Sequence, residues 1–378
     1  MNQPKQRFVY IDLLRGWAVL VMIEVHVVNA FLLPEVREAA WFPIVNFING
    51  LVAPSFLFVS GYAFVLVAQR KWDEYLRGTP VLWKQIGRML QILAVGYALH
   101  IPVFSFSALS QLPWEGWSMF LNVDVLHAIA VSLLVLLGLV LVIRDRKRFL
   151  PGMTVLALAV IYGTPYVYDR NIDHLLPVPL ANYFTAAHGS LFPLLPWMGF
   201  VLCGGVTAQL TVVWKERLGD RKMFFSILMA GMLFIGIPLL MDFIPYSFLP
   251  AHEYGRANPG FFFIRLGIVL MLLSVLWFWE QRYRSGNSMV SVVGSESLVA
   301  YAGHLLVIYG EFFNNRSANV LIGQTRTITE VIGMTIVLIA ATIAVSYVWH
   351  RIKNWSMFYA RVLMMSILIV VLIFFFIQ

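Results

Sequence analysis

Eleven apolar runs recur along the chain, and each is long enough to cross about 30 Å of hydrocarbon as a helix. Only 12% of the residues are charged, whereas a typical soluble domain has about 25%. No linker, low-complexity tract or second domain interrupts this pattern. We therefore expect an all-α polytopic membrane protein, with about eleven transmembrane helices in a single domain over residues 1–378. The runs cover residues 9–33, 44–68, 84–104, 122–143, 150–168, 190–213, 223–242, 261–281, 290–313, 328–349 and 356–377.

Basic residues are unevenly distributed between the loops. Nineteen lysines and arginines precede the first run or follow the second, fourth, sixth, eighth and tenth, whereas five lie in the alternate loops. Cytoplasmic loops of membrane proteins carry such an excess. The N-terminus is therefore predicted to be cytoplasmic and the C-terminus outside, and the net charge of +8 does not indicate nucleic-acid binding. The only cysteine, Cys203, cannot form an intrachain disulfide.

The first run carries polar residues on one helical face. Arg15, Asp12 and Asn29 lie about 20°, 40° and 60° from His26 in azimuth at 100° per residue, while Glu24 points about 160° away from His26. Charges inside a bilayer are costly and commonly functional, so this face is expected to line a polar cavity or a substrate path. Simpler interpretations are a salt bridge between Asp12 and Arg15, snorkelling of Arg15, and a helix–helix hydrogen bond of His26.

Histidines concentrate on one predicted side of the membrane. Seven of the eight fall in the outer half under this topology, and imidazole can both accept and donate a proton near neutral pH. Asp124 and His127 share one face of the fourth span; the carboxylate either orients the imidazole or caps the helix. His188 precedes a helix whose first turn contains Pro193 and Pro196. That helix N-terminus could hold an oxyanion or a sugar hydroxyl.

The ninth span carries another polar stripe. Ser297, Tyr301 and His304 have the spacing i, i+4, i+7, and Glu311 extends the stripe. The stripe either lines a cavity or packs against another helix. The chain has no glycine-rich phosphate loop, metal-ligand cluster or dinucleotide fingerprint. Nucleotide hydrolysis, redox chemistry and a metal site are therefore not expected, which leaves proton-assisted group transfer or transport.

Four segments together resemble a known family. IDLLRGWAVLVMIEVH (11–26), APSFLFVSGYAF (53–64), LFPLLPWMGFVLCGG (191–205) and VGSESLVAYAGHLLVIY (293–309) are similar, in this order, to segments of transmembrane acyltransferases. The first contains an arginine and a histidine separated by ten residues, Arg15 and His26. The combination looks most like bacterial relatives of heparan-α-glucosaminide N-acetyltransferase, and the resemblance is strongest over residues 7–310.

The resemblance implies transfer of an acyl group, usually acetyl, from cytoplasmic acetyl-CoA to a carbohydrate acceptor on the outer side. The family's essential histidine and arginine would be His26 and Arg15, and its ninth-span histidine would be His304. Lysosomal members carry a histidine in the loop after the first helix, whereas residues 34–43 here contain none. Either His26 takes the catalytic role, or the mechanism differs.

On this interpretation, Arg15 and inner-loop bases bind the anionic CoA, Asp12 fixes Arg15, and His26 acts as general base or transient acyl carrier. The acceptor site would be lined by Asp124, His127, His188, Ser297, Tyr301 and His304. The expected location is the bacterial cytoplasmic membrane, as a multi-pass protein whose partners are lipid, acyl-CoA and the carbohydrate; a homo-oligomer is left open.

Two other functional classes fit the same sequence. A proton-coupled transporter or flippase of a small polar or glycolipid substrate would also carry intramembrane ionisable residues. It would be distinguished by paired broken helices in inverted repeats, which the sequence does not display. A scaffold subunit of an envelope complex ranks last because it leaves the polar face of the first span unexplained.

Overall fold

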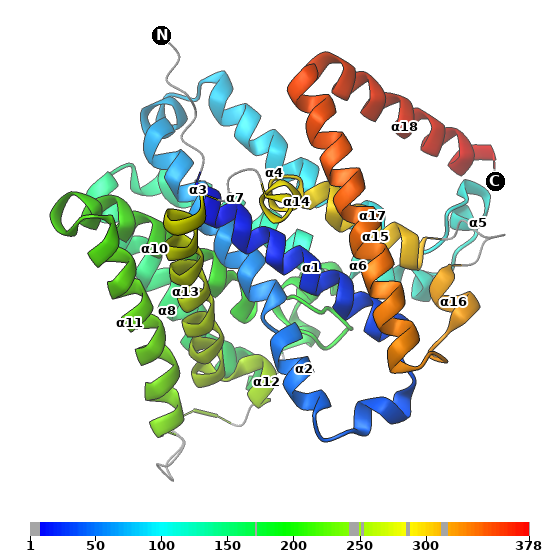
Figure 1. Cartoon of the computed structure of the whole chain (residues 1–378), viewed down its shortest axis with the longest axis horizontal. Coiled ribbons are helices and arrows are strands. Elements are labelled where there is room, and N and C mark those ends of the chain that lie inside the picture. The colour runs from blue at the N-terminus through cyan, green and yellow to red at the C-terminus, as the bar shows by residue number, and fades with distance from the viewer. Residues whose placement is uncertain are drawn as a thin grey trace. The chain divides into compact units, whose positions relative to one another are not determined.

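The computed structural model describes residues 8–170, 172–241, 249–250, 253–284, 288–310 and 317–377, and those residues contain helices and no strand (Figure 1). Helices make up 85% of the residues that the structure describes. The lipid interior favours this class, because a helix satisfies its backbone hydrogen bonds within itself. The predicted all-α polytopic membrane fold is confirmed.

Within the described residues, eight helices are long and apolar enough to cross a membrane, and a bent pair brings the number to nine. These eight are Phe42–Leu76, Val125–Ile143, Arg146–Arg170, Leu194–Leu218, Asp220–Met241, Pro259–Tyr283, Ile328–Trp355 and Met357–Ile377. The bent pair is Met289–Ser295 with Ser297–Tyr309, which meet at 88°. Two more predicted spans coincide with Val9–Phe31 and Pro80–Leu99. The count of eleven and the sidedness of the termini stay predictions.

The chain divides into two compact units. The first comprises Met1–Val52, Ile101–Trp117 and Trp279–Gln378, and the second Ala53–His100 and Ser118–Phe278. Helices of the first unit are α1 (Val9–Phe31), η1 (Pro34–Glu38), α2 (Phe42–Asn49), α5 (Phe106–Ser110), η2 (Trp114–Trp117), α14 (Met289–Ser295), α15 (Ser297–Tyr309), α16 (Ala318–Ile322), α17 (Ile328–Trp355) and α18 (Met357–Ile377).

Helices of the second unit are α3, which begins at the boundary (Val52–Leu76), α4 (Pro80–Leu99), α6 (Ser118–Leu121), α7 (Val125–Ile143), α8 (Arg146–Arg170), η3 (Ile172–Leu175), α9 (Val178–Phe184), α10 (Leu194–Leu218), α11 (Asp220–Met241), α12 (Tyr254–Ala257) and α13 (Pro259–Tyr283), whose last turns pass into the first unit.

In the first unit, α1 packs against α14, α15 and α17, and α1 and α14 lie side by side in Figure 1. Their backbones meet at two glycines: a Cβ atom on Gly16 would overlap the carbonyl oxygen of Val290, and one on Gly294 would overlap that of Asp12. Small residues permit such close approach between membrane helices. This contact therefore sets the position of α1 relative to the broken span.

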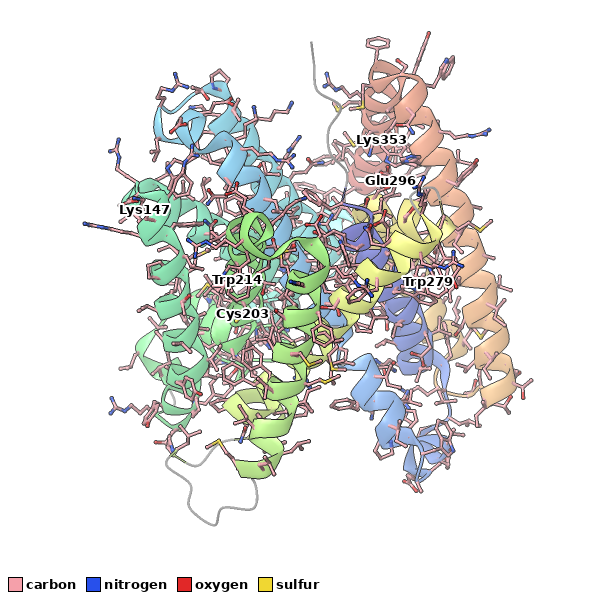
Figure 2. All side chains as sticks on the ribbon, turned by 60° about the vertical axis from the view of Figure 1, so that its left-hand side comes forward. Lys147, Cys203, Trp214, Trp279, Glu296 and Lys353 are labelled. Atoms are coloured by element: carbon pink, nitrogen blue, oxygen red, sulfur yellow. The ribbon has the colours of Figure 1, made fainter. Side chains whose placement is uncertain are left out.

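A buried ionic cluster holds the break between α14 and α15. Glu296 lies at the break and is only 5% exposed. Its carboxylate accepts a hydrogen bond from Lys353 Nζ at 2.7 Å, and Figure 2 labels both residues. The same carboxylate pairs with His350 Nδ1 at 2.9 Å, and both partners come from α17. The predicted ninth span is thus two helices joined at a paired carboxylate.

In the second unit, α10 lies at the centre and packs against α7, α8, α9, α11 and α12. Glycines again allow the closest contacts, because Cβ atoms on Gly61 and Gly204 would overlap the carbonyl oxygens of Val201 and Phe58. α4 packs along α7. That pairing brings the end of α4 to the start of α7.

Candidate functional site

Packing of α1 against α15 brings two predicted site histidines together in the first unit. The ring centroids of His26 and His304 are 5.2 Å apart. Tyr301 meets His304 edge-on at 5.9 Å, and Tyr309 meets His26 edge-on at the same distance. His304 is 1% exposed and Tyr301 is 5% exposed, whereas His26 is half-buried. Two imidazoles and two phenols therefore form one cluster, called here the α1–α15 cluster.

The backbone sets the tautomer of His304. Its Nδ1 lies 2.7 Å from the carbonyl oxygen of Ala300. A carbonyl oxygen only accepts hydrogen bonds, so Nδ1 carries the proton and the neutral ring keeps a lone pair on Nε2. That Nε2 atom is buried and has no hydrogen-bond partner in the part of the chain that the structure describes. A buried, unpaired imidazole lone pair is suited to accept a proton from a reacting group.

Other predicted residues of this unit lie further along the same helices. Ser297 is half-buried at the start of α15, about 10 Å from His304 along the helix axis. The Asp12–Arg15 salt bridge forms, but Arg15 Nη1 and Asp12 Oδ1 are 3.9 Å apart. Arg15 lies about 16 Å from His26 along α1, so it does not touch the cluster. Glu311, which was predicted to extend the stripe, lies outside the described residues.

A second cluster forms in the other unit, where α4 meets α7. Asp124 is the N-cap residue of α7, and its backbone N–H donates to His127 Nδ1 at 3.2 Å. This is the helix-capping alternative predicted for the pair. The rings of Tyr97 and His100 lie 4.3 Å and 5.4 Å from the His127 ring. His127 is fully buried.

His127 and His100 both engage Nδ1 with the backbone, but the remaining nitrogen, Nε2, is protonated in His127 and unprotonated in His100. Because His127 Nδ1 accepts a hydrogen bond, its neutral ring carries the proton on Nε2, which is buried and unpartnered among the described residues. His100 Nδ1 donates to the carbonyl of Gly96 at 3.0 Å, so its neutral ring keeps the lone pair on Nε2. One imidazole can donate and the other can accept, which suits a hydroxyl group because it needs both.

Two tyrosines complete this second cluster, called here the α4–α7 cluster. The hydroxyl groups of Tyr97 and Tyr183 are 2.9 Å apart, and Tyr183 comes from α9. Burial, followed by the hydrogen bond to Tyr97, raises the pKa of Tyr183, so its hydroxyl stays protonated at neutral pH. Sequence reasoning singled out neither tyrosine. The contact joins residues 86 positions apart, and no local spacing could have indicated it.

His188 stays apart from both clusters. It is exposed, and its side chain makes no hydrogen bond or ring contact within the described ranges. Its carbonyl oxygen instead accepts from the side-chain amide of Asn122 once the amide is oriented to satisfy its neighbours. Among the residues described, no group of three or more histidine, cysteine or acidic side chains is placed to hold a metal ion.

A family model described as heparan-alpha-glucosaminide N-acetyltransferase, catalytic, matches residues 7–244 of the chain, which is more than half of its length. The match includes Asp12, Arg15 and His26, and also the α4–α7 cluster. It ends before α15, so His304 lies beyond it. No curated protein matches the chain.

Proposed function

Because the chain belongs to the heparan-α-glucosaminide N-acetyltransferase catalytic family, an acetyltransferase-type family, we propose that it moves an acetyl group from acetyl-CoA to a carbohydrate acceptor. The donor enters from the cytoplasmic side and the acceptor binds on the outer side of a bacterial cytoplasmic membrane, in keeping with the predicted orientation. One domain carries out the whole transfer.

The observation that carries this proposal is the buried lone pair of His304 beside His26. His304 Nε2 removes a proton from the acceptor hydroxyl or amine while that oxygen or nitrogen bonds to the thioester carbon. The carbon–sulfur bond then breaks, and the resulting imidazolium returns the proton to the thiolate, so that CoA leaves as the thiol. His26 stabilises the charge that develops on His304, or acts as the base itself.

Arg15 is proposed to bind a phosphate of CoA. Its guanidinium is too far from Asp12 for a hydrogen bond, and within the described residues it makes no other polar contact. Its side chain is 25% exposed, so a ligand can reach it. Several N–H donors are thus available for a phosphate, which guanidinium binds in a forked geometry. Asp12 keeps the guanidinium near this position.

The α4–α7 cluster is proposed to recognise the acceptor. Its paired donor and acceptor nitrogens, on His127 and His100, match a sugar hydroxyl. Tyr97 supplies an aromatic face beside them. In the first unit, Ser297 and Tyr301 of α15 are proposed to contact the acceptor beside His304. The exposed His188 is proposed as a further acceptor contact that belongs to neither cluster.

Release of CoA thiol by the detergent-purified protein, with acceptor present, tests the chemistry. General base catalysis contributes about 10²–10⁴-fold, so His304→Ala should lower kcat at least about 100-fold. Ser226→Ala, on the exposed face of α11, is the control and should leave kcat unchanged. Full acetyl transfer by both His304→Ala and His26→Ala would show that these histidines are not the base.

Binding of acetyl-CoA is tested by thermal shift. A ligand at 100 times its Kd stabilises the folded state by about 2.7 kcal/mol. The wild type should show this shift and Arg15→Ala should lose it. Arg170→Gln, at the exposed last residue of α8 and on the predicted outer side, should retain it. A shift retained in Arg15→Ala would place the donor elsewhere.

A second candidate function is a proton-coupled transporter or flippase, and the bent α14–α15 pair favours it. Discontinuous helices with ionisable residues form substrate and ion sites in secondary transporters. Those folds use such helices in pairs from two repeats, whereas the described residues contain one bent pair. Proton-coupled uptake without acyl-CoA consumption would establish this function instead.

A further inference from the structure

A pocket that neither cluster includes lies in the second unit, where α10, α12 and α13 meet. It contains about 230 Å³ of empty space, its open mouth included. Six of its lining side chains are aromatic or basic: Trp197, Phe200, Phe261, Phe262, Arg256 and Arg265. The pocket lies at the first turns of α10 and α13, which the predicted orientation places on the outer side.

Arg265 is the central polar group of this pocket. Its guanidinium lies 4.0 Å from the centroid of the Phe261 ring and 5.8 Å from that of Trp197. Its Nη1 donates to the carbonyl oxygen of Gly255 at 3.4 Å. No carboxylate lies within ion-pair distance of it among the residues described. Most of its five N–H donors therefore remain available, on a half-buried side chain.

The remaining lining reinforces this bias toward anions. Arg256 adds a second guanidinium, which Glu253 neutralises only in part, because their ion pair is 3.4 Å long and exposed. Acidic side chains do not line the pocket in the described part of the chain. The half-buried ring of Trp197 offers a flat apolar surface beside the charge. An oxyanion on an apolar or ring-shaped group matches both features.

We propose that this pocket binds a sugar that carries a phosphate or carboxylate group. The oxyanion accepts hydrogen bonds from the Arg265 fork, and the sugar ring packs against Trp197. The proposal concerns binding alone, so it does not depend on acyl transfer.

Saturation-transfer NMR on the full chain in zwitterionic detergent tests this binding with four probes: glucose 6-phosphate, glucuronate, glucose and inorganic phosphate. Charge-assisted hydrogen bonds should make the two anionic sugars bind at least about tenfold more tightly than glucose. Glucose 6-phosphate should also bind more tightly than inorganic phosphate, because the sugar ring contacts Trp197. Equal affinity for glucose and the anionic sugars would overturn the proposal. Equal affinity for glucose 6-phosphate and inorganic phosphate would show that the pocket does not recognise a sugar ring.

Variants locate the site. Arg265→Met should abolish the preference for anionic sugars, and Arg265→Lys should weaken it because lysine lacks the forked geometry. Arg217→Gln, at the other end of α10, should change nothing. If Arg265→Met does not fold, the preference for anionic sugars is measured in Arg265→Lys and Trp197→Leu instead. If every folded variant of Arg265 and Trp197 keeps the wild-type preference for anionic sugars, this pocket is not the binding site. If the wild-type protein loses that preference when anionic lipid is added, the pocket binds a lipid headgroup instead.

Discussion

Replacing Lys353 with methionine removes one cation from the buried carboxylate that joins α14 to α15. The Glu296 side chain is 4% exposed and that of Lys353 is 34% exposed. Loss of one partner from a fully buried pair costs about 3–5 kcal/mol. Water reaches Lys353, and His350 still contacts Glu296 at 2.9 Å after the change. We therefore expect Lys353→Met to lower the free energy of unfolding by about 2 kcal/mol.

Equilibrium unfolding in mixed micelles, followed by tryptophan fluorescence, measures this change. The matched control is Lys215→Met, because Lys215 pairs with Asp220 at 3.4 Å but both side chains are about half exposed. Exposed pairs contribute about 0–1 kcal/mol, so this control should lose well under 1 kcal/mol.

The double variant Lys353→Met/Glu296→Gln separates a real interaction from two independent losses. Its loss of unfolding free energy should be smaller than the sum of the two single losses by about 1–2 kcal/mol. The reason is that the neutral amide introduced by Glu296→Gln leaves no buried charge unpaired when Lys353 is removed. Equal losses for Lys353→Met and Lys215→Met would refute the reasoning. Glu296 precedes His304 by about 12 Å of helix, so acetyl transfer should fall together with stability.

Three other outcomes follow from the same structure. Gly16→Ala should lower the free energy of unfolding by about 1–3 kcal/mol, because the added methyl group overlaps α14. Gly87→Ala has open space around it and should leave stability unchanged. Equal melting temperatures of the two variants would contradict the close contact between α1 and α14. Arg37→Gln should destabilise the end of α1 by about 1 kcal/mol, because Arg37 donates to its last carbonyls, and unchanged amide exchange there would argue against this. In ¹⁵N-histidine spectra at neutral pH, His304 should carry its proton on Nδ1 and His127 on Nε2; the reverse would invalidate the proposed base.

The helical segments followed closely from the apolar runs. The run 328–349 became Ile328–Trp355, and the run 356–377 became Met357–Ile377. Apolar length carries this information locally, because a helix satisfies its own backbone wherever it lies in the membrane. The break at Glu296 could not be predicted in this way. It depends on side chains 54 and 57 residues later, and no local pattern relates those positions to Glu296.

The candidate site, like the fold, was predictable where it depends on local sequence and unpredictable where it depends on tertiary contacts. Sequence by itself determined which residues are polar within apolar helices and which face they share, since helical periodicity places Arg15 near the azimuth of His26 and His304 near that of Tyr301. Only the tertiary structure decided that His26 meets His304, that His127 meets His100 and Tyr97, and that His188 meets neither. It also assigned the tautomers, because the proton position depends on which backbone group faces each ring. Contacts between helices depend on close packing at residues such as Gly16, and that packing joins parts of the chain that no local pattern relates.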